Sequence, residues 1–339
     1  MINKIKLKFL IIKDYLKNKL DELNQTSFMK KLSSFFSVGD RRFVLHLYLI
    51  AIGVFIVTLL YNELTIAISG DFYLQQIPFY HNGYDDWWTF IKTGEFPMWD
   101  ESGFLGVNNI GANAFYYIWN IFFLPILILP RALVPQGLAF LIITKFVLSG
   151  YVMKKLLRYI GVSEKVSTLV SMAYAFSGWS LFYLWFNHFL EITICLPLVL
   201  LGLEKLLKEK KVTFLIVSLF ISAITNYYFF IMICFTSVIY AVYRFFQYAK
   251  NYTLKEAFGV MGLGLVSYIV AMFMALIVLV PCFQVAISSS RVDMDNANTF
   301  TGKLIEALKL ALEAYKGKDF DSLKENIKKV LEICLKFDE

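Results

Sequence analysis

Charged residues are scarce in this chain. Asp, Glu, Lys and Arg make up 17% of its 339 residues, whereas 58% are hydrophobic and the mean hydropathy is +0.61. A soluble domain of ordinary composition has about 25% charged and 45–50% apolar residues. The composition therefore predicts a membrane protein and argues against a purely water-soluble globular one.

Cysteine and the common catalytic motifs are also scarce. The four cysteines (195, 234, 282 and 334) are too far apart to indicate a disulfide framework or a CxxC metal site. The sequence contains no P-loop, GxGxxG, HExxH or GxSxG motif, so nucleotide-driven pumping and the familiar hydrolase classes lack support. The net charge is +7, and the basic residues are grouped in segments between apolar stretches, as expected if they set the orientation in a membrane. No nucleic-acid partner is therefore expected.

Long apolar stretches, in contrast, are abundant. A bilayer core needs about 17–25 apolar residues per helix, and seven stretches are candidate spans: 43–61, 137–153, 166–186, 189–203, 212–226, 228–246 and 258–280. The fourth and fifth are short, so they either cross with help from flanking residues or lie partly buried among other helices. The predicted fold is an all-α integral membrane bundle of about seven spans.

Lysine and arginine predict the orientation through the positive-inside rule. Residues 1–42 carry ten basic residues, so the amino terminus is expected in the cytoplasm. The loop 62–112 then faces outward, and it holds seven acidic residues against the single Lys92. There is an eighth apolar stretch, 113–130. If it crossed the membrane, eleven later basic residues would lie on the outer side, against the positive-inside rule. We therefore expect 113–130 to be a re-entrant or interfacial segment on the outer side.

The two ends of the chain have different predicted structures. Residues 1–23 repeat apolar positions at steps of three and four with lysines between them, which predicts a basic amphipathic helix. Such a helix suits an anionic cytoplasmic leaflet or docking against the protein's own loops, and the pattern leaves both open. Residues 301–339 are rich in lysine and glutamate and predict a soluble helical hairpin.

The outer loop 62–112 is too long for a passive connector and is dense in aromatic residues. These aromatic side chains suit either a membrane-anchoring belt or contact faces for sugar and lipid. Asp71 follows the first span, where a carboxylate near lipid head groups is a candidate general base for an acceptor hydroxyl. The alternative is that Asp71 caps a short juxtamembrane helix through its side-chain oxygen.

Other polar residues converge on the same predicted outer face. His188 and Glu191 share a helical face, so they are candidates for a metal site, an acid–base pair or a simple interfacial hydrogen bond. Asn226–Tyr228 marks a break between two apolar runs, either a turn or a ligand-contacting loop. Lys145 and Arg291 are candidates to neutralise a lipid phosphate, or merely to pair or snorkel. Ionisable residues in a membrane are functional candidates by default.

Six segments carry a more specific signal as an ordered combination. They are GDFYLQQIPFY (70–80), FPMWDESGFLGVNN (96–109), NAFYYIWNIFFLPILILP (113–130), AYAFSGW (173–179), the His188/Glu191 pair and TNYYFF (225–230). Together they resemble the YfhO family of bacterial membrane proteins over about three quarters of the chain, from Phe43 to Arg291. The domain predicted from this resemblance is 43–291, between the basic segment 1–42 and the tail 301–339.

The resemblance implies a fold of the GT-C type, with juxtamembrane helices and a catalytic acidic residue in the first outer loop. It also implies an inverting glycosyltransferase of the bacterial cytoplasmic membrane, which moves a sugar from a polyprenyl-phosphate donor to an envelope polymer such as lipoteichoic acid. The missing nucleotide motif agrees with a lipid-linked donor. No cofactor is assigned, and a divalent metal stays open.

Carried over position by position, the resemblance assigns roles to individual residues. Asp71 fits the acidic residue after the first span, and Arg291 or Lys145 would face the lipid phosphate. The implied outer-face polar set is Gln75, Trp99, Asn109, Tyr116, Tyr117, His188, Glu191, Asn226 and Tyr228.

Chains of this family are normally longer, with further spans where residues 301–339 stand. This difference implies a short or truncated member, or a helical addition at the tail. The competing function is a non-catalytic membrane protein, either a lipid-carrier transporter or an assembly scaffold.

Overall fold

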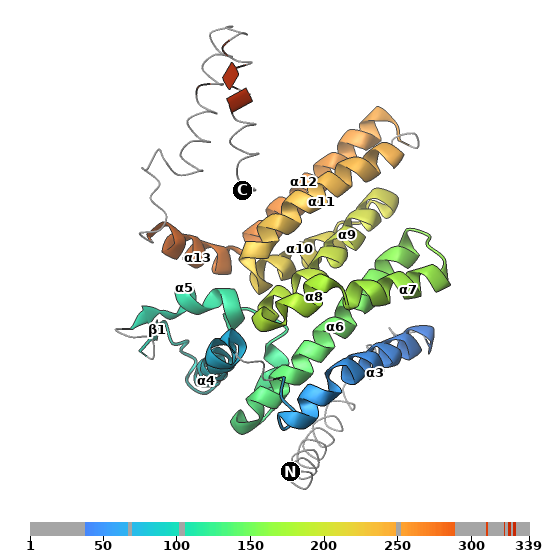
Figure 1. Ribbon diagram of the computed structural model, residues 1–339. Helices are drawn as coiled ribbons and strands as arrows, with labels where there is room; N and C mark the ends of the chain where they lie inside the picture. The colour runs from blue at the N-terminus through green and yellow to red at the C-terminus, as the bar shows by residue number, and fades with distance from the viewer. Residues whose placement is uncertain are drawn as a thin grey trace. The chain divides into compact units, whose positions relative to one another are not determined.

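The computed structural model describes residues 38–66, 70–101, 106–248 and 252–288, with six further residues of the tail, and this part of the chain is almost entirely helical (Figure 1). The predicted amphipathic segment 1–23 and Arg291 lie outside the described residues. So does nearly all of the predicted hairpin 301–339.

Long helices alternate with short helical turns. The α-helices are α3 (Val38–Tyr61), α4 (Ile77–Thr93), α5 (Asn109–Asn113), α6 (Val134–Tyr159), α7 (Glu164–Ala175), α8 (Gly178–Phe182), α9 (Ile192–Glu209), α10 (Thr213–Thr225), α11 (Tyr227–Tyr248), α12 (Leu254–Met274) and α13 (Leu276–Ser288). The turns are the π-helical η1 (Phe72–Gln76) and η2 (Ala114–Ile118) and the 3-10 helical η3 (Leu124–Ile128), η4 (Arg131–Leu133) and η5 (Tyr183–Phe189). Two short antiparallel strands, β1 (Trp99–Asp100) and β2 (Val107–Asn108), pair Trp99 with Asn108.

Five helical stretches of the described chain are long and apolar enough to cross a membrane: Gly39–Tyr61, Arg131–Tyr159, Glu164–Phe189, Tyr227–Tyr248 and Lys255–Met274. The predicted number of seven is therefore supported only in part. The predicted spans 189–203 and 212–226 correspond to α9 and α10. Helix α9 carries four charged residues in its last six positions, and the 13 residues of α10 extend only about 20 Å.

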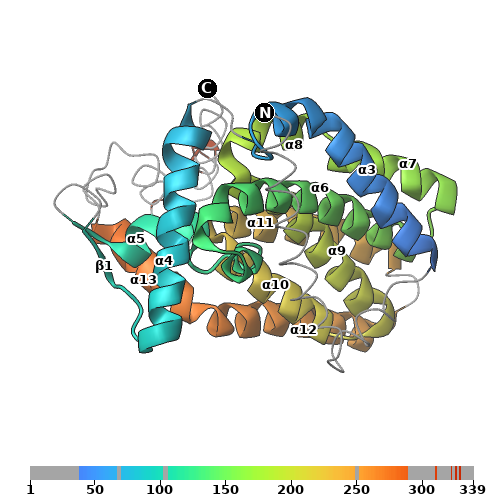
Figure 2. The same ribbon diagram turned by 90° about the horizontal axis from the view of Figure 1, so that it is seen from below.

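Helices α6 and α9 are central to the bundle. Helix α6 packs against α3, α7 and α9, and α9 packs in turn against α10, α11 and α12 (Figures 1 and 2). Within its apolar stretch α6 is 67% buried, compared with 28% or less for the other four candidate spans. Lys145, in the middle of this stretch of α6, is accordingly buried by protein.

One end of the bundle is bound together by charged side chains. Lys154 at the end of α6 pairs with Glu164 at the start of α7 over 2.6 Å. Lys210 after α9 pairs with Glu256 at the start of α12 over 2.8 Å, and Arg244 of α11 pairs with Glu204 of α9. Three of the eleven later basic residues, Lys154, Lys210 and Arg244, thus lie in ion pairs at one end of the bundle. This agrees with a segment 113–130 that forms the short turns η2 and η3 and no continuous helix.

The opposite end of the bundle is covered by a cap made of α4, α5, η1, η2 and η3. Figure 2 shows α4 running across the ends of the bundle helices. Tyr84 of α4 donates a hydrogen bond to the carbonyl of Leu129 over 2.8 Å, and Trp87 donates to the carbonyl of Ile118 over 3.0 Å. The predicted outer loop 62–112 therefore contains a helix, as expected, and this helix holds the segment 113–130 in place.

Candidate functional site

Asp71 lies after α3 and immediately before the π-helical turn η1. Its backbone is already helical (φ −58°, ψ −29°), and its side chain makes no capping hydrogen bond. The alternative prediction of an N-cap role is therefore wrong, because a cap needs an extended backbone that turns the side chain back onto the helix. The carboxylate is exposed, and no hydrogen bond or ion pair with another described residue engages it.

Two aromatic side chains lie near this part of the chain, one against Gly70 and one within the electrostatic reach of Asp71. The ring of Trp185 packs against Gly70, where an added Cβ would lie 2.8 Å from Cζ3 of the indole. Tyr116 of η2 is half-buried; burial raises the pKa of its hydroxyl above the ordinary value, and the negative charge of Asp71 raises it further. The exposed Asp71 carboxylate therefore acts electrostatically on the hydroxyl of Tyr116, and an indole packs on the residue before it.

Below Asp71, η1 is fixed by Gln76. Its side chain is buried, and its Oε1 accepts a hydrogen bond from Asn187 Nδ2 over 2.9 Å. His188 Nδ1 lies 3.3 Å from the same oxygen, and Tyr80 donates to Asn187 Oδ1 over 2.8 Å. The predicted residue, Gln75, is only half-buried and makes no such bond among the described residues. The side-chain amide that anchors η1 is thus that of Gln76, the residue after the predicted Gln75.

The same network continues into a buried ion pair. Lys145 Nζ of α6 lies 2.7 Å from Glu191 Oε1, and the two side chains are 0% and 1% exposed. Lys145 also donates to the backbone and side-chain oxygens of Asn187 over 3.0 and 2.9 Å, and Asn120 donates to Glu191. The charge of Lys145 is therefore already neutralised. The expectation that Lys145 meets a lipid phosphate is not supported, whereas the alternative of pairing is.

His188 and Glu191 do not form a pair with each other. The imidazole of His188 packs edge-on against the rings of Phe115 and Tyr116, with ring centroids 4.8 and 4.9 Å apart. Glu191 is engaged by Lys145 instead. In the described part of the chain, no group of three His, Cys, Asp or Glu side chains could hold a metal ion. The predicted alternative of an interfacial His–Glu hydrogen bond is therefore wrong.

Asn226 occupies the turn between α10 and α11. Its Nδ2 donates to the carbonyl of His188 over 3.3 Å, and its Oδ1 accepts from the backbone N–H of Phe229 over 3.2 Å. The neighbouring Tyr228 is 47% exposed and its ring lies 6.0 Å from that of Phe115. The structure thus gives Asn226 a turn-forming role and leaves Tyr228 accessible.

Three other predicted site residues lie in the cap or next to it. Asn109 is fully buried and donates to Asp86 Oδ2 and to the carbonyl of Pro97, both over 2.9 Å. Burial raises the pKa of Asp86, and the bond from Asn109 opposes that rise. Tyr117 is also fully buried. Trp99, in contrast, is 57% exposed on β1. Asn109 and Tyr117 are therefore buried inside the cap.

Comparison with known families assigns the chain to a family of membrane proteins. A family model described as "Bacterial membrane protein YfhO" matches residues 42–330. The chain belongs to the YfhO family. No curated protein and no solved structure matches it. The YfhO match continues beyond Arg291, where the resemblance of the sequence segments ended, and includes most of the tail 301–339.

Sequence reasoning missed four residues of this candidate site: Gln76, Asn120, Trp185 and Asn187. Asn120 and Asn187 each stand inside a strongly apolar stretch, and an amide in such a stretch is costly unless it is hydrogen-bonded. That signal was present in the sequence. The importance of Gln76 and Trp185 depends on packing between segments more than a hundred residues apart, and no local pattern indicates it.

Proposed function

We propose that this YfhO protein is an inverting glycosyltransferase of the GT-C type. It would transfer a sugar from a polyprenyl-phosphate donor to an envelope polymer outside the cytoplasmic membrane, such as lipoteichoic acid. The observation that supports this function best is the exposed Asp71 carboxylate, which neither caps a helix nor pairs with another described residue. A carboxylate left uncommitted beside a rigid polar network is suited to general-base catalysis.

The proposed reaction uses Asp71 as the base for the acceptor hydroxyl. Asp71 takes the hydroxyl proton, and the oxygen attacks the anomeric carbon of the sugar in line with the bond to the phosphate. The new C–O bond forms as the old one breaks, and polyprenyl phosphate leaves with the electron pair. Attack from the face opposite the leaving group inverts the anomeric centre.

The network beneath Asp71 supports this role by holding η1 in position. Gln76 accepts a hydrogen bond from Asn187 over 2.9 Å, and Asn187 is itself held by Lys145 and Tyr80. A base acts efficiently only when its distance to the reacting atom is fixed by its surroundings. Arg291 remains the proposed cation for the departing phosphate, because Lys145 is already paired with Glu191.

The test is the transfer of labelled sugar from synthetic polyprenyl-phosphate donors to envelope polymer by the purified protein. Asp71→Asn is expected to lower the rate constant for transfer by about 10²–10⁴-fold, the range typical for loss of a general base. Glu95→Gln is the matched control, because Glu95 is an exposed carboxylate of the same loop; it should retain wild-type transfer.

Two outcomes would contradict the proposal in different ways. Full transfer by a normally folded Asp71→Asn protein would remove Asp71 from the mechanism. Donor binding without transfer by wild-type protein would favour a non-catalytic carrier transporter or scaffold. A transporter would move donor between leaflets independently of Asp71, and a scaffold would bind partner proteins without needing the polar outer site.

A further inference from the structure

The cap end of the bundle is almost without exposed positive charge. Among the described residues of this end (62–66, 70–101, 106–136, 176–192 and 225–230), Lys92 and Arg131 are the basic ones, against a clear excess of Asp and Glu. These two cations lie 39 positions apart in the sequence, yet the fold brings both to one pocket. Two cations that share one pocket in an otherwise acidic surrounding indicate a candidate binding site for a ligand.

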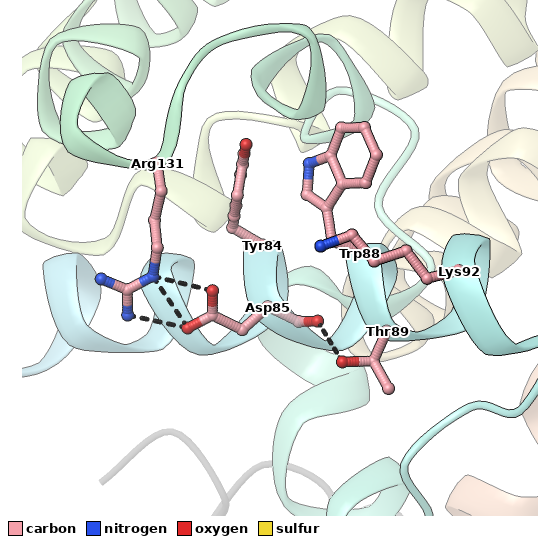
Figure 3. A pocket seen from close by; sticks show the side chains of 6 residues that line it. All are labelled: Tyr84, Asp85, Trp88, Thr89, Lys92 and Arg131. Atoms are coloured by element: carbon pink, nitrogen blue, oxygen red, sulfur yellow. Dashed lines mark hydrogen bonds and ion pairs between the residues drawn. The ribbon is translucent and has the colours of Figure 1, made fainter.

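The pocket has a volume of about 460 Å³ and lies between α4 and η4 (Figure 3). Five of its residues recur on one face of α4, and Arg131 comes from η4. The residues that line it are Tyr84, Asp85, Trp88, Thr89, Lys92 and Arg131. The lining therefore combines two aromatic rings with three charged side chains.

The hydrogen-bonding capacity of the pocket favours an anion. Asp85 accepts three hydrogen bonds from Arg131. Nε donates to Oδ1 over 2.7 Å and to Oδ2 over 3.0 Å, and Nη2 donates to Oδ2 over 2.7 Å, so Nη1 is not engaged by Asp85 (Figure 3). The ammonium of Lys92 lies 5.7 Å from the ring centroid of Trp88, and none of the described residues accepts a hydrogen bond from it. Positively charged donors thus outnumber negatively charged acceptors.

The position of the pocket indicates the source of the anion. Arg131 opens the apolar stretch Arg131–Tyr159, so the pocket lies where a membrane-spanning helix leaves the hydrocarbon core. Trp, Tyr, Lys and Arg at that level are the side chains that contact lipid head groups. Asp71 begins the same continuous helical run 14 residues before Asp85, which places it about 20 Å away. The pocket is therefore separate from the Asp71 site.

We infer that this pocket binds the head group of an anionic phospholipid, with the phosphodiester between Lys92 and Arg131 and the polyol over Trp88 and Tyr84. The acyl chains would lie along the apolar stretch that begins at Arg131. This binding is independent of the proposed glycosyl transfer, since neither the lipid nor the pocket residues take part in it.

The test is native mass spectrometry of the purified full chain in a neutral detergent, titrated with dioctanoyl-phosphatidylglycerol or dioctanoyl-phosphatidylcholine. Lys92→Met is expected to weaken phosphatidylglycerol binding about fivefold, the effect typical of one cation at an anionic membrane surface. Asp85→Asn is expected to strengthen it by a similar factor, because Asp85 competes for Arg131. Both Asp85 and Arg131 are about half exposed, so Asp85→Asn should fold normally.

Lys165→Met is the matched control, because Lys165 is an exposed lysine at the opposite, ion-paired end; its lipid binding should equal wild type. Equal binding of the two lipids, or equal phosphatidylglycerol binding by wild type, Lys92→Met and Asp85→Asn, would overturn the inference. Displacement of the lipid by equimolar sn-glycerol 1-phosphate would also overturn it, since the pocket would then recognise a soluble phosphate and not a membrane lipid.

Discussion

At the scale of single residues, the pair of Lys145 and Glu191 is the most consequential feature. The two charges are 2.7 Å apart, and both side chains are removed from solvent. Desolvation makes such a pair a weak source of stability, but removal of one partner leaves an uncompensated buried charge. Asn120 and Asn187 add hydrogen bonds to the pair. The pair therefore fixes the relation between α6 and the segment before α9.

We expect Lys145→Met to destabilise the protein by about 3–5 kcal/mol, because it leaves Glu191 charged and buried without its partner. The double variant Lys145→Met/Glu191→Leu should recover most of this loss, since it removes both charges. Unfolding of the detergent-solubilised variants by a chemical denaturant measures both changes in the free energy of unfolding. Equal loss in the single and double variants would show that the side-chain volumes, and not the charges, matter.

How far the sequence predicts the site depends on the kind of residue. Asp71, His188 and Glu191 were identified because an ionisable group beside an apolar stretch is costly and visible as such. Their partners were not identified. Glu191 is bound by Lys145 and not by His188, and Gln76 anchors η1 in place of Gln75. The partners come from distant parts of the chain. A single sequence therefore shows that an ionisable residue is costly in an apolar stretch, but it does not show which residue pairs with it.

At the scale of elements, the packing of α4 on η2 depends on a missing side chain. Gly83 of α4 is buried, and a Cβ added there would lie 2.3 Å from Cδ2 of Tyr117. The ring of Tyr117 occupies the space that any other residue at position 83 would need. This contact joins the predicted outer loop to the segment 113–130, and the two together form the cap.

Gly83→Ala is therefore expected to destabilise the protein by about 1–3 kcal/mol through overpacking. The control is Gly53→Ala in α3, where an added Cβ meets nothing within 4 Å. That substitution should be neutral or slightly stabilising, because alanine favours a helix more than glycine does. Thermal unfolding of the two variants in the same detergent compares them. If Gly83→Ala were as stable as Gly53→Ala, the cap would have to be loosely packed.

The cap also shows where element prediction from sequence reaches its limit. The apolar stretch 113–130 has enough length for a span, and only the positions of later basic residues argued against one. In the structure, this stretch breaks into η2 and η3. Hydrogen bonds from Tyr84 and Trp87 engage its backbone carbonyls at Leu129 and Ile118. Several of its apolar side chains are buried by packing inside the cap; the ring of Phe123, for example, packs against those of Tyr80 and Tyr117.

At the scale of the whole molecule, the two ends of the bundle differ in charge. One end gathers lysine and arginine in ion pairs between helices. The cap end is acidic, with Lys92 and Arg131 as its exposed cations among the described residues. The positive-inside rule predicts that the ion-paired end faces the cytoplasm, and the proposed function requires that the cap faces outward.

Single cysteines introduced into a cysteine-free background test this orientation. Glu95→Cys lies in the exposed segment after α4, outside the pocket, and should react with a membrane-impermeant maleimide in intact cells. Lys165→Cys lies at the ion-paired end and should react only after the membrane is permeabilised. The opposite result would reverse the orientation and would place Asp71 on the cytoplasmic side.

The sequence alone determined that this is a helical membrane protein, where most of its spans lie and which end gathers the basic residues. These properties follow from hydropathy and charge, which act locally and are independent of packing. Only the tertiary structure decided that Asp71 is uncommitted, that Lys145 is neutralised by Glu191, and that Lys92 and Arg131 share a pocket. Each of these depends on which distant segments meet, and a linear pattern does not contain that information.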